Sequence, residues 1–419
     1  MKHTIILALL TFLPWLGVKA QFNTSRLIIS GRSALYYEDY VLSIQYFNQA
    51  ITAKPHLYEP WFYRGLAKFY LDDFEGAEDD VTHAIELNPY ISNMYELRGL
   101  ARIRTKNFTG AISDYDHSLA INPHNQSAWY NRALCRVETK DYDRAQLDLD
   151  TITTKWKKFA GAYSMKAEVF LMQKDTTAAV EWLDRSIDID PYDAATWTAK
   201  AMISLARSKW KDADEALSKS LHLKPKNVNN YVNRALARYN TNNLRGAMAD
   251  YDMAIDLDPD NFLAHYNRGL LRMQLGDDNR AIIDFDYVIR MEPHNVLAIF
   301  NRALLLDRTG NLRAAIRDYS DVIAQFPNFW TGLSRRAACY RRLGMTAKAE
   351  VDEFRIMKAQ MDKHLGIQPR WSNKKRRAMR KRSEIDPDKY NRMVVADENS
   401  TEHEYKNAYR GRVQDRTTA

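Results

Sequence analysis

Prolines recur in this chain at intervals of 34 residues, and this period restricts the accessible folds more than any other feature. They stand at Pro55, Pro89, Pro123, Pro191, Pro225, Pro259, Pro293 and Pro327, with one interval skipped at Lys157. Small residues recur with the same period at two further positions of the unit. Gly269 is a member of the series in the first half of the unit, and Ala281 of the series in the second half. Three series with one period predict a chain built from copies of a single supersecondary unit.

The stretch 262–295 indicates what one unit folds into. Apolar residues recur at helical spacing over about 262–275 and again over 279–291, with turn-forming residues at 276–278. This pattern predicts two amphipathic helices joined by a short turn. Pro293 ends the second helix, because proline has no N–H to donate and clashes with the preceding turn.

These features resemble the tetratricopeptide repeat (TPR) family, whose unit of about 34 residues carries W-x2-L-G-x2-Y, then A-x3-F, then P. Aromatic residues stand at two of these positions: Trp61, Trp129 and Trp197 in the first helix, and Phe47, Tyr115, Tyr251, Phe285 and Tyr319 in the second. The resemblance implies an all-α, right-handed α-solenoid of about ten TPR helix-turn-helix repeats over 24–363. The repeats are expected to start near residues 24, 58, 92, 126, 160, 194, 228, 262, 296 and 330.

Residues 1–20 are predicted to be a secretory signal peptide. Lys2 precedes an apolar run over 4–16, and small residues at 18–20 suit cleavage after Ala20. An uncleaved membrane anchor is the alternative, but the run is shorter than the ~20 residues that a spanning helix needs. We therefore expect an exported protein that is periplasmic or associated with the outer envelope.

The formal net charge of +8 belongs to the ends of the chain. The repeats balance acids and bases, whereas the tail over 364–419 is basic and is expected to be partly flexible. Its bases cluster at Lys374, Lys375, Arg376, Arg377, Arg380, Lys381 and Arg382. Such a cluster favours an anionic surface, and export makes nucleic acid an unexpected partner. Within the tail, the apolar stretch 390–396 is expected to dock on the last repeat or to pair with a partner strand.

An arginine stands just before the small first-helix residue in seven repeats, and each of these repeats has an aspartate 16 residues later. The pairs are Arg64 with Asp80, Arg98 with Asp114, Arg132 with Asp148, Arg234 with Asp250, Arg268 with Asp284, Arg302 with Asp318, and Arg336 with Asp352. The pairing predicts an Arg–Asp bridge within a repeat or between adjacent repeats. A row of arginines offered to an acidic ligand is the alternative. Arg268→Leu is expected to leave ligand binding intact and to change the melting temperature modestly.

The resemblance also implies a partner-binding groove lined by first helices. Its positions in this chain are Phe62, Leu66, Leu100, Tyr130, Leu134, Leu236, Tyr266, Leu270, Phe300 and Leu304. Residues four apart share one face of a helix, so these side chains form an apolar and aromatic stripe that suits an apolar peptide. The stripe lacks the lysines and asparagines of TPRs that clamp C-terminal carboxylates. A core between first helices is the alternative interpretation.

The middle of the chain departs from this regularity. Between 151 and 227 the proline period is interrupted, and Trp156, Lys157 and Lys158 occupy the junction between two repeats. The alternatives are simple drift of the repeat or a modified centre that bends or binds.

No phosphate-binding loop, nucleophile motif or metal-ligand spacing occurs in the sequence, so we expect no enzymatic activity, no cofactor and no metal. Cys135 and Cys339 lie six repeats apart and are expected to be core residues. The sequence therefore predicts a non-catalytic protein–protein interaction scaffold or adaptor of the cell envelope, with other proteins or peptides as partners. The alternatives are a membrane- or glycan-associated assembly factor that uses the basic tail, an accessory subunit of an envelope enzyme complex, and a small-molecule or carbohydrate recognition solenoid.

Overall fold

The structure, a computed structural model, describes residues 23–365, Met393 and Ala396. Over these residues twenty helices follow one another and no strand occurs, which confirms the all-α prediction. None of the described helices is long and apolar enough to cross a lipid bilayer. The predicted signal peptide (1–20) and the basic cluster (374–382) lie outside the described residues.

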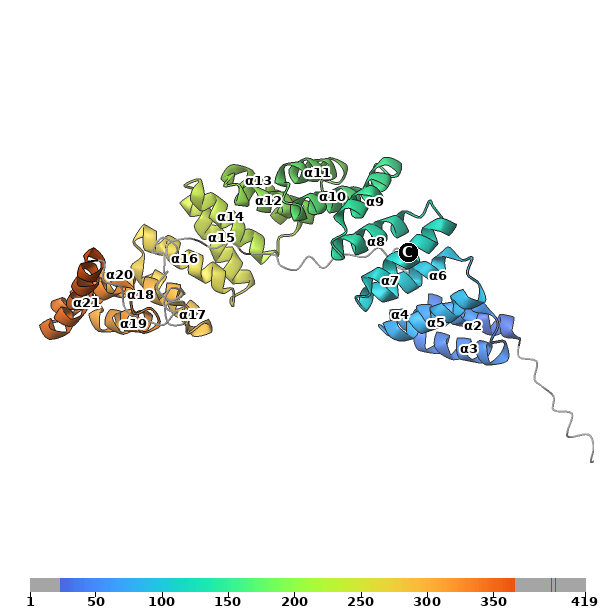
Figure 1. Cartoon of the computed structure of the whole chain (residues 1–419), viewed down its shortest axis with the longest axis horizontal. Helices are drawn as coiled ribbons and strands as arrows, with labels where there is room; N and C mark the ends of the chain where they lie inside the picture. The colour runs from blue at the N-terminus through green and yellow to red at the C-terminus, as the bar shows by residue number, and fades with distance from the viewer. Residues whose placement is uncertain (1–22, 366–392, 394–395, 397–419) are drawn as a thin grey trace, which may run out of the picture. The chain divides into compact units, whose positions relative to one another are not determined.

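The chain divides into two compact units between residues 190 and 191. Each unit is an α-solenoid of five helical hairpins (Figure 1). The hairpins of the first unit are α2 (Thr24–Tyr36) with α3 (Tyr40–Ala53), α4 (Tyr58–Tyr70) with α5 (Phe74–Leu87), α6 (Ser92–Arg104) with α7 (Phe108–Ile121), α8 (Gln126–Glu138) with α9 (Tyr142–Lys155), and α10 (Ala160–Met172) with α11 (Thr176–Ile189). Those of the second unit are α12 (Ala194–Ala206) with α13 (Trp210–Leu223), α14 (Val228–Asn240) with α15 (Leu244–Leu257), α16 (Phe262–Leu275) with α17 (Asp278–Met291), α18 (Val296–Arg308) with α19 (Leu312–Gln325), and α20 (Trp330–Arg342) with α21 (Thr346–His364).

The turn inside a hairpin is set by two neighbouring residues. One adopts a left-handed backbone, with φ of 61° at Lys106 and 79° at Gly276. In the third hairpin the next residue, Asn107, caps the second helix, because its side chain accepts a hydrogen bond from the Gly110 N–H at 3.1 Å. A left-handed residue followed by a cap reverses the chain within a few residues, so the two helices pack side by side.

One hydrogen bond links the proline series to the tryptophan series. Trp61 Nε1 donates to the carbonyl of Pro55 at 3.0 Å, and Trp129 Nε1 donates to that of Pro123 at 3.0 Å. The indole therefore holds the end of the preceding hairpin against the first helix of the next. This contact explains why both residue types recur with the period of the repeat.

The second-helix aromatic residue packs against the small residue of the first helix. Tyr115 and Phe285 are fully buried. A Cβ atom at Gly99 would lie 3.0 Å from the Tyr115 ring, and one at Gly269 would lie 3.1 Å from the Phe285 ring. Each aromatic ring thus occupies the space left by a missing side chain, which is how the repeat achieves close packing between its helices.

The predicted Arg–Asp bridge is confirmed in all seven repeats that carry the pair, and it joins the two helices of one repeat. The closest nitrogen–oxygen distances are 2.6–2.7 Å, and every one of the seven aspartates is 5% exposed or less. The arginine also reaches back to the preceding repeat, as Arg268 does to Asp252 at 2.8 Å and Arg132 to Asp116 at 2.6 Å. Arg132 and Arg268 therefore each have one carboxylate partner in their own repeat and another in the preceding repeat.

The fifth repeat lacks this aspartate and uses a different arrangement. Lys166 forms an ion pair with Asp150 of the preceding repeat, and its ammonium group lies 3.8 Å from the centre of the Trp182 ring. The indole face thus takes the place of the missing carboxylate, because a cation above an aromatic face is electrostatically favourable.

Glu96 on α6 is buried at a position where several other repeats place an apolar residue, such as Phe62, Val232 and Phe300. It is 5% exposed, and its Oε1 accepts a hydrogen bond from Ser118 Oγ at 3.2 Å. Burial raises the pKa of Glu96 above its ordinary value, although hydrogen bonds from Asn125 and Ser118 act in the opposite direction. The stability that comes from a raised carboxyl pKa is present at low pH and is lost as the pH rises through that pKa.

We therefore expect Glu96→Gln to raise the free energy of unfolding at pH 8 by about 1 kcal/mol, because the buried charge is removed while the shape is kept. The gain should shrink at pH 4, where the native glutamate binds a proton. Urea unfolding at both pH values checks this, with Glu86→Gln as the control, since the side chain of Glu86 is 66% exposed. A gain that does not depend on pH would contradict the assignment.

Candidate functional site

Most of the predicted groove residues lie inside the stack. Eight of the ten are buried, between 1% and 8% exposed: Phe62, Leu66, Leu100, Leu134, Leu236, Tyr266, Leu270 and Phe300. Tyr130 and Leu304 are half-buried. Phe62 and Leu66 pack with residues of α5 and α6, and Leu134 packs with residues of α9 and α10. These side chains hold neighbouring helices together, and their contact with a partner stays a prediction.

A row of buried asparagines follows the predicted groove position by one residue. In the second unit it consists of Asn233 on α14, Asn267 on α16 and Asn301 on α18, each 0% exposed. We call these three residues the asparagine row. Asn131 on α8 has the equivalent place in the first unit and is 2% exposed. A buried side-chain amide is costly unless its donors and acceptor are bonded, so a row of them marks a place where polar atoms are gathered.

The predicted stripe itself holds no asparagine, and the asparagine row stands beside it, one residue further along each first helix. The signal is present in the sequence, because each of these asparagines directly precedes the repeated arginine, in N-R-A or N-R-G. It falls one residue beyond the apolar stripe, and an asparagine amid apolar residues does not alter a hydropathy pattern.

Asn233 holds a single residue of the tail by both of its backbone groups. The Ala396 N–H donates to Asn233 Oδ1 at 2.9 Å, and Asn233 Nδ2 donates to the Ala396 carbonyl at 3.0 Å. Ala396 is 1% exposed, so water does not compete for these two bonds. A side-chain amide that donates and accepts in this way recognises a peptide backbone irrespective of its side chains.

Met393 lies at the junction of the seventh and eighth repeats. Its sulfur accepts a hydrogen bond from the Tyr251 hydroxyl at 3.2 Å. Its side chain packs against the apolar cluster built on α14, α15 and α16, and also against the cluster built on α16, α17 and α18. The two described residues of the apolar tail stretch therefore contact the seventh and eighth repeats, and the expected docking on the last repeat is wrong for them. The remainder of 390–396 lies outside the described residues.

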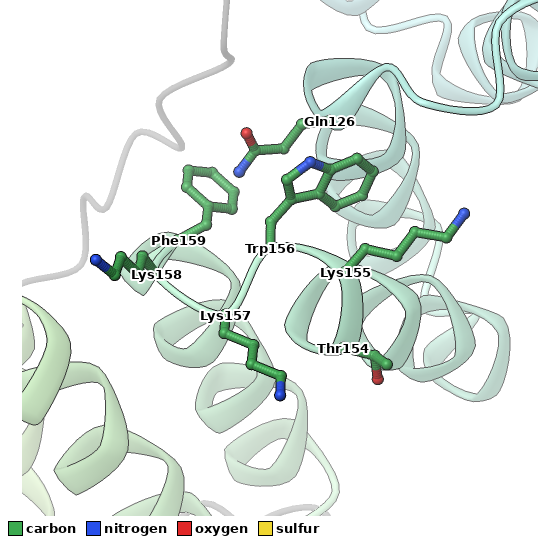
Figure 2. Close-up of a pocket in the computed structure, with 7 residues that line it drawn as sticks. All are labelled: Gln126, Thr154, Lys155, Trp156, Lys157, Lys158 and Phe159. Atoms are coloured by element: carbon green, nitrogen blue, oxygen red, sulfur yellow. The ribbon is translucent and has the colours of Figure 1, made fainter.

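The interrupted proline period coincides with an open hollow of about 540 Å³ in the first unit. Figure 2 shows its lining: Gln126, Thr154, Lys155, Trp156, Lys157, Lys158 and Phe159. The three lysine side chains point in different directions, so their ammonium groups do not converge on one anion (Figure 2). Packing within the hollow is aromatic, with the rings of Tyr130 and Phe159 edge to face at 5.1 Å. A centre that bends or binds at this junction stays a prediction.

The two cysteines are buried within first helices, as expected. Cys135 and Cys339 are each 0% exposed, and burial raises the pKa of both thiols to about 12. Thiolate is the reactive form of cysteine, so neither side chain is suited to nucleophilic chemistry at neutral pH. Among the described residues, no group of histidine, cysteine, aspartate and glutamate side chains is arranged to hold a metal ion.

The stacked pairs of helices define a class, the α-solenoids built from helix-turn-helix repeats. Family models agree with this class: one for the TPR repeat matches residues 238–276, and one for the tetratricopeptide repeat matches residues 130–194 and 300–362. The chain is a multi-repeat TPR protein. No curated protein sequence matches it.

Solved structures of TPR proteins are similar to parts of the chain. A tetratricopeptide repeat protein from Parabacteroides merdae is 17% identical, with 59% of this chain and 98% of that chain covered and a TM-score of 0.43. The C-terminal part of a TPR repeat-containing protein from Cytophaga hutchinsonii is 15% identical, with 65% and 98% covered and a TM-score of 0.41. The first TPR domain of Spaghetti, solved with a bound HSP90 peptide, is 25% identical, with 28% and 93% covered and a TM-score of 0.28.

Proposed function

We propose that this protein is a non-catalytic scaffold or adaptor of the cell envelope that binds a peptide segment of a partner protein along the asparagine row. TPR proteins generally mediate protein–protein interactions. The observation that carries the proposal is the pair of hydrogen bonds between Asn233 and the backbone of Ala396. It identifies the kind of group that this face holds, which is a peptide unit.

The repeat places the same side chain on two further first helices, where Asn301 Nδ2 donates to the Tyr266 hydroxyl at 3.4 Å. Asn233, Asn267 and Asn301 occupy one position of three successive first helices, and all three are buried. Hydrogen bonds to a peptide backbone supply affinity, while pockets for the side chains supply specificity. A partner segment is therefore expected to be read mainly through its main chain, with selection at the few side chains that enter the stack.

The proposed location rests on the N-terminal sequence. A lysine, an apolar run and small residues over 1–20 are typical of a secretory signal peptide. The near-neutral charge of the repeats supports a protein partner rather than nucleic acid, which proteins bind through basic surfaces.

The test uses a displayed library of random dodecapeptides selected on the full-length protein. Selected peptides should bind the Asn267→Ala/Asn301→Ala variant at least tenfold more weakly, because each lost hydrogen bond contributes ~1 kcal/mol. Fluorescence anisotropy measures the Kd, and circular dichroism checks that the variant is folded.

The matched control is Asn279→Ala, since Asn279 is exposed on α17 of the same unit. It should bind the selected peptides like the unaltered protein. Equal binding by the folded row variant, or an equal loss in the control, would reject the asparagine row as the binding surface.

A further inference from the structure

The helices at the junction of the seventh and eighth repeats are less closely packed than their neighbours. In the second unit, α15 and α16 contact each other less extensively than the other helices that connect successive repeats. Met393 and Ala396 lie in this junction and join the apolar clusters on its two sides. The space between these repeats is thus filled by a part of the chain that lies more than 100 residues further along.

We propose that this junction is a binding site for peptides with an unbranched apolar side chain three residues before a small residue, and that the segment carrying Met393 and Ala396 is its resident occupant. The proposal deepens the proposed function and rests on it. It specifies which peptides the asparagine row selects, and it means that a partner has to displace a part of this same chain.

The small residue is selected by the space around Ala396. Its side chain lies in a cluster with Val232, Ala235, Tyr251 and Leu271, which are all fully buried. Asn233 fixes its backbone from one side through two hydrogen bonds, so the residue cannot move outward without breaking them. A larger side chain would overlap closely packed neighbours, because protein interiors leave few voids.

The surroundings of Met393 select the apolar side chain. The Met393 side chain touches the clusters of both repeats, and its sulfur accepts a hydrogen bond from the buried Tyr251 hydroxyl. A flexible thioether side chain fills irregular gaps of this kind better than a branched one. The seventh repeat therefore supplies both the backbone contact of Ala396 and the polar contact of Met393.

The two selected residues contact neighbouring repeats. Ala396 is bonded by Asn233 on α14, and Met393 packs against residues of α16, while three residues of extended chain span about 10 Å. A peptide that places Ala396 against α14 and Met393 toward α16 advances about one repeat every three residues. Asn267 and Asn301 would then meet peptide units three and six residues before the small residue.

Because the resident segment is part of the chain, it competes strongly with any added peptide. A tethered ligand has an effective concentration of about millimolar, which a peptide in solution at micromolar concentration does not match. A variant that cannot seat its own segment is therefore expected to bind the same peptide from solution more tightly than the unaltered protein does.

The experiment uses the full-length protein and a fluorescein-labelled peptide with the sequence of residues 388–400. The Ala396→Trp variant should bind this peptide at least tenfold more tightly than the unaltered protein, as measured by anisotropy. Adding Asn233→Ala to this variant should remove the gain. Ala408→Trp, which places the same residue elsewhere in the tail, is the control and should bind like the unaltered protein.

Hydrogen exchange followed by mass spectrometry supplies a second readout that needs no tail variant. The Ala396 amide should exchange slowly in the unaltered protein and rapidly in Asn233→Ala. Rapid exchange in the unaltered protein, together with equal peptide binding by it and by Ala396→Trp, would overturn the resident occupant. If Asn233→Ala then still weakens binding of the labelled peptide, the asparagine row binds peptides and only the resident occupant is wrong. If Asn233→Ala leaves the binding of this peptide unchanged, the proposed function fails for this peptide as well.

Discussion

Phe285→Ala is expected to lower the free energy of unfolding of the second unit by about 3–5 kcal/mol, the usual cost of truncating a buried phenylalanine. Phe285 is fully buried on α17, and its ring lies in the space beside Gly269 on α16. It also meets the ring of Tyr266 edge to face, with centroids 5.8 Å apart. Removing the ring would leave a cavity that Gly269 cannot fill, so the packing between the two helices of the eighth repeat is weakened.

Urea unfolding followed by circular dichroism measures this loss. Phe262→Ala is the control, because Phe262 lies on the same hairpin but is 37% exposed, and it should cost less than about 1 kcal/mol. In a solenoid each repeat contacts only its neighbours, so faster hydrogen exchange should be concentrated in α16–α18. Equal losses in the two variants would show that the aromatic position is not the centre of the repeat.

The repeat architecture is predictable from the sequence because its contacts are local and recur. Trp61 meets Pro55, and Arg64 meets Asp80, so each contact joins residues that keep a constant separation in sequence. A constant separation appears as a period, and the same pairing in seven repeats identifies the Arg–Asp bridge before any coordinates are known.

The candidate site could not be predicted from the sequence in this way, for two physical reasons. Asn233 contacts Ala396 across 163 residues, and this separation occurs once and leaves no period. Leu134 and Leu236 share the face of a first helix that suits a groove, yet both are buried. Apolar residues at helical spacing predict which face is covered but do not distinguish a neighbouring helix from a partner peptide. Asn233 marks the difference at its own position, because it bonds both backbone groups of Ala396, and a neighbouring helix has no free backbone groups along its length.

Replacing both Arg268 and Arg272 by leucine is expected to lower the free energy of unfolding by about 3–5 kcal/mol, the cost of leaving a buried charge without its partners. Asp284 is 1% exposed, and Arg268 and Arg272 each approach it at 2.7 Å. His265 Nδ1 lies 3.2 Å from the same carboxylate. Arg268→Leu alone keeps two of these partners and should cost about 1–2 kcal/mol, in line with the modest effect expected from the sequence. The double variant should therefore lose more than the sum of the two single changes.

The pH dependence separates lost charge pairing from lost packing. Burial acts to raise the pKa of Asp284, but hydrogen bonds from His265 and Arg268 outweigh it and hold the pKa below its ordinary value. The stability that comes from this lowered pKa is present at neutral pH and is lost as the pH falls. Without the two guanidinium groups, burial dominates the pKa of Asp284 and raises it. The double variant should therefore gain stability as the pH falls, and its difference in free energy of unfolding from the unaltered protein should become smaller.

Asp284→Leu, added to the double variant, should restore much of the lost stability at pH 7, because an apolar side chain in place of the carboxylate leaves no buried charge. Arg280→Leu is the control, since the Arg280 side chain is 72% exposed, and it should have little effect. Urea unfolding at pH 4 and pH 7 measures all of these variants. A gap that keeps its size at both pH values, with no recovery on removing the carboxylate, would mean that the arginines act through their aliphatic packing and not through the charge of Asp284.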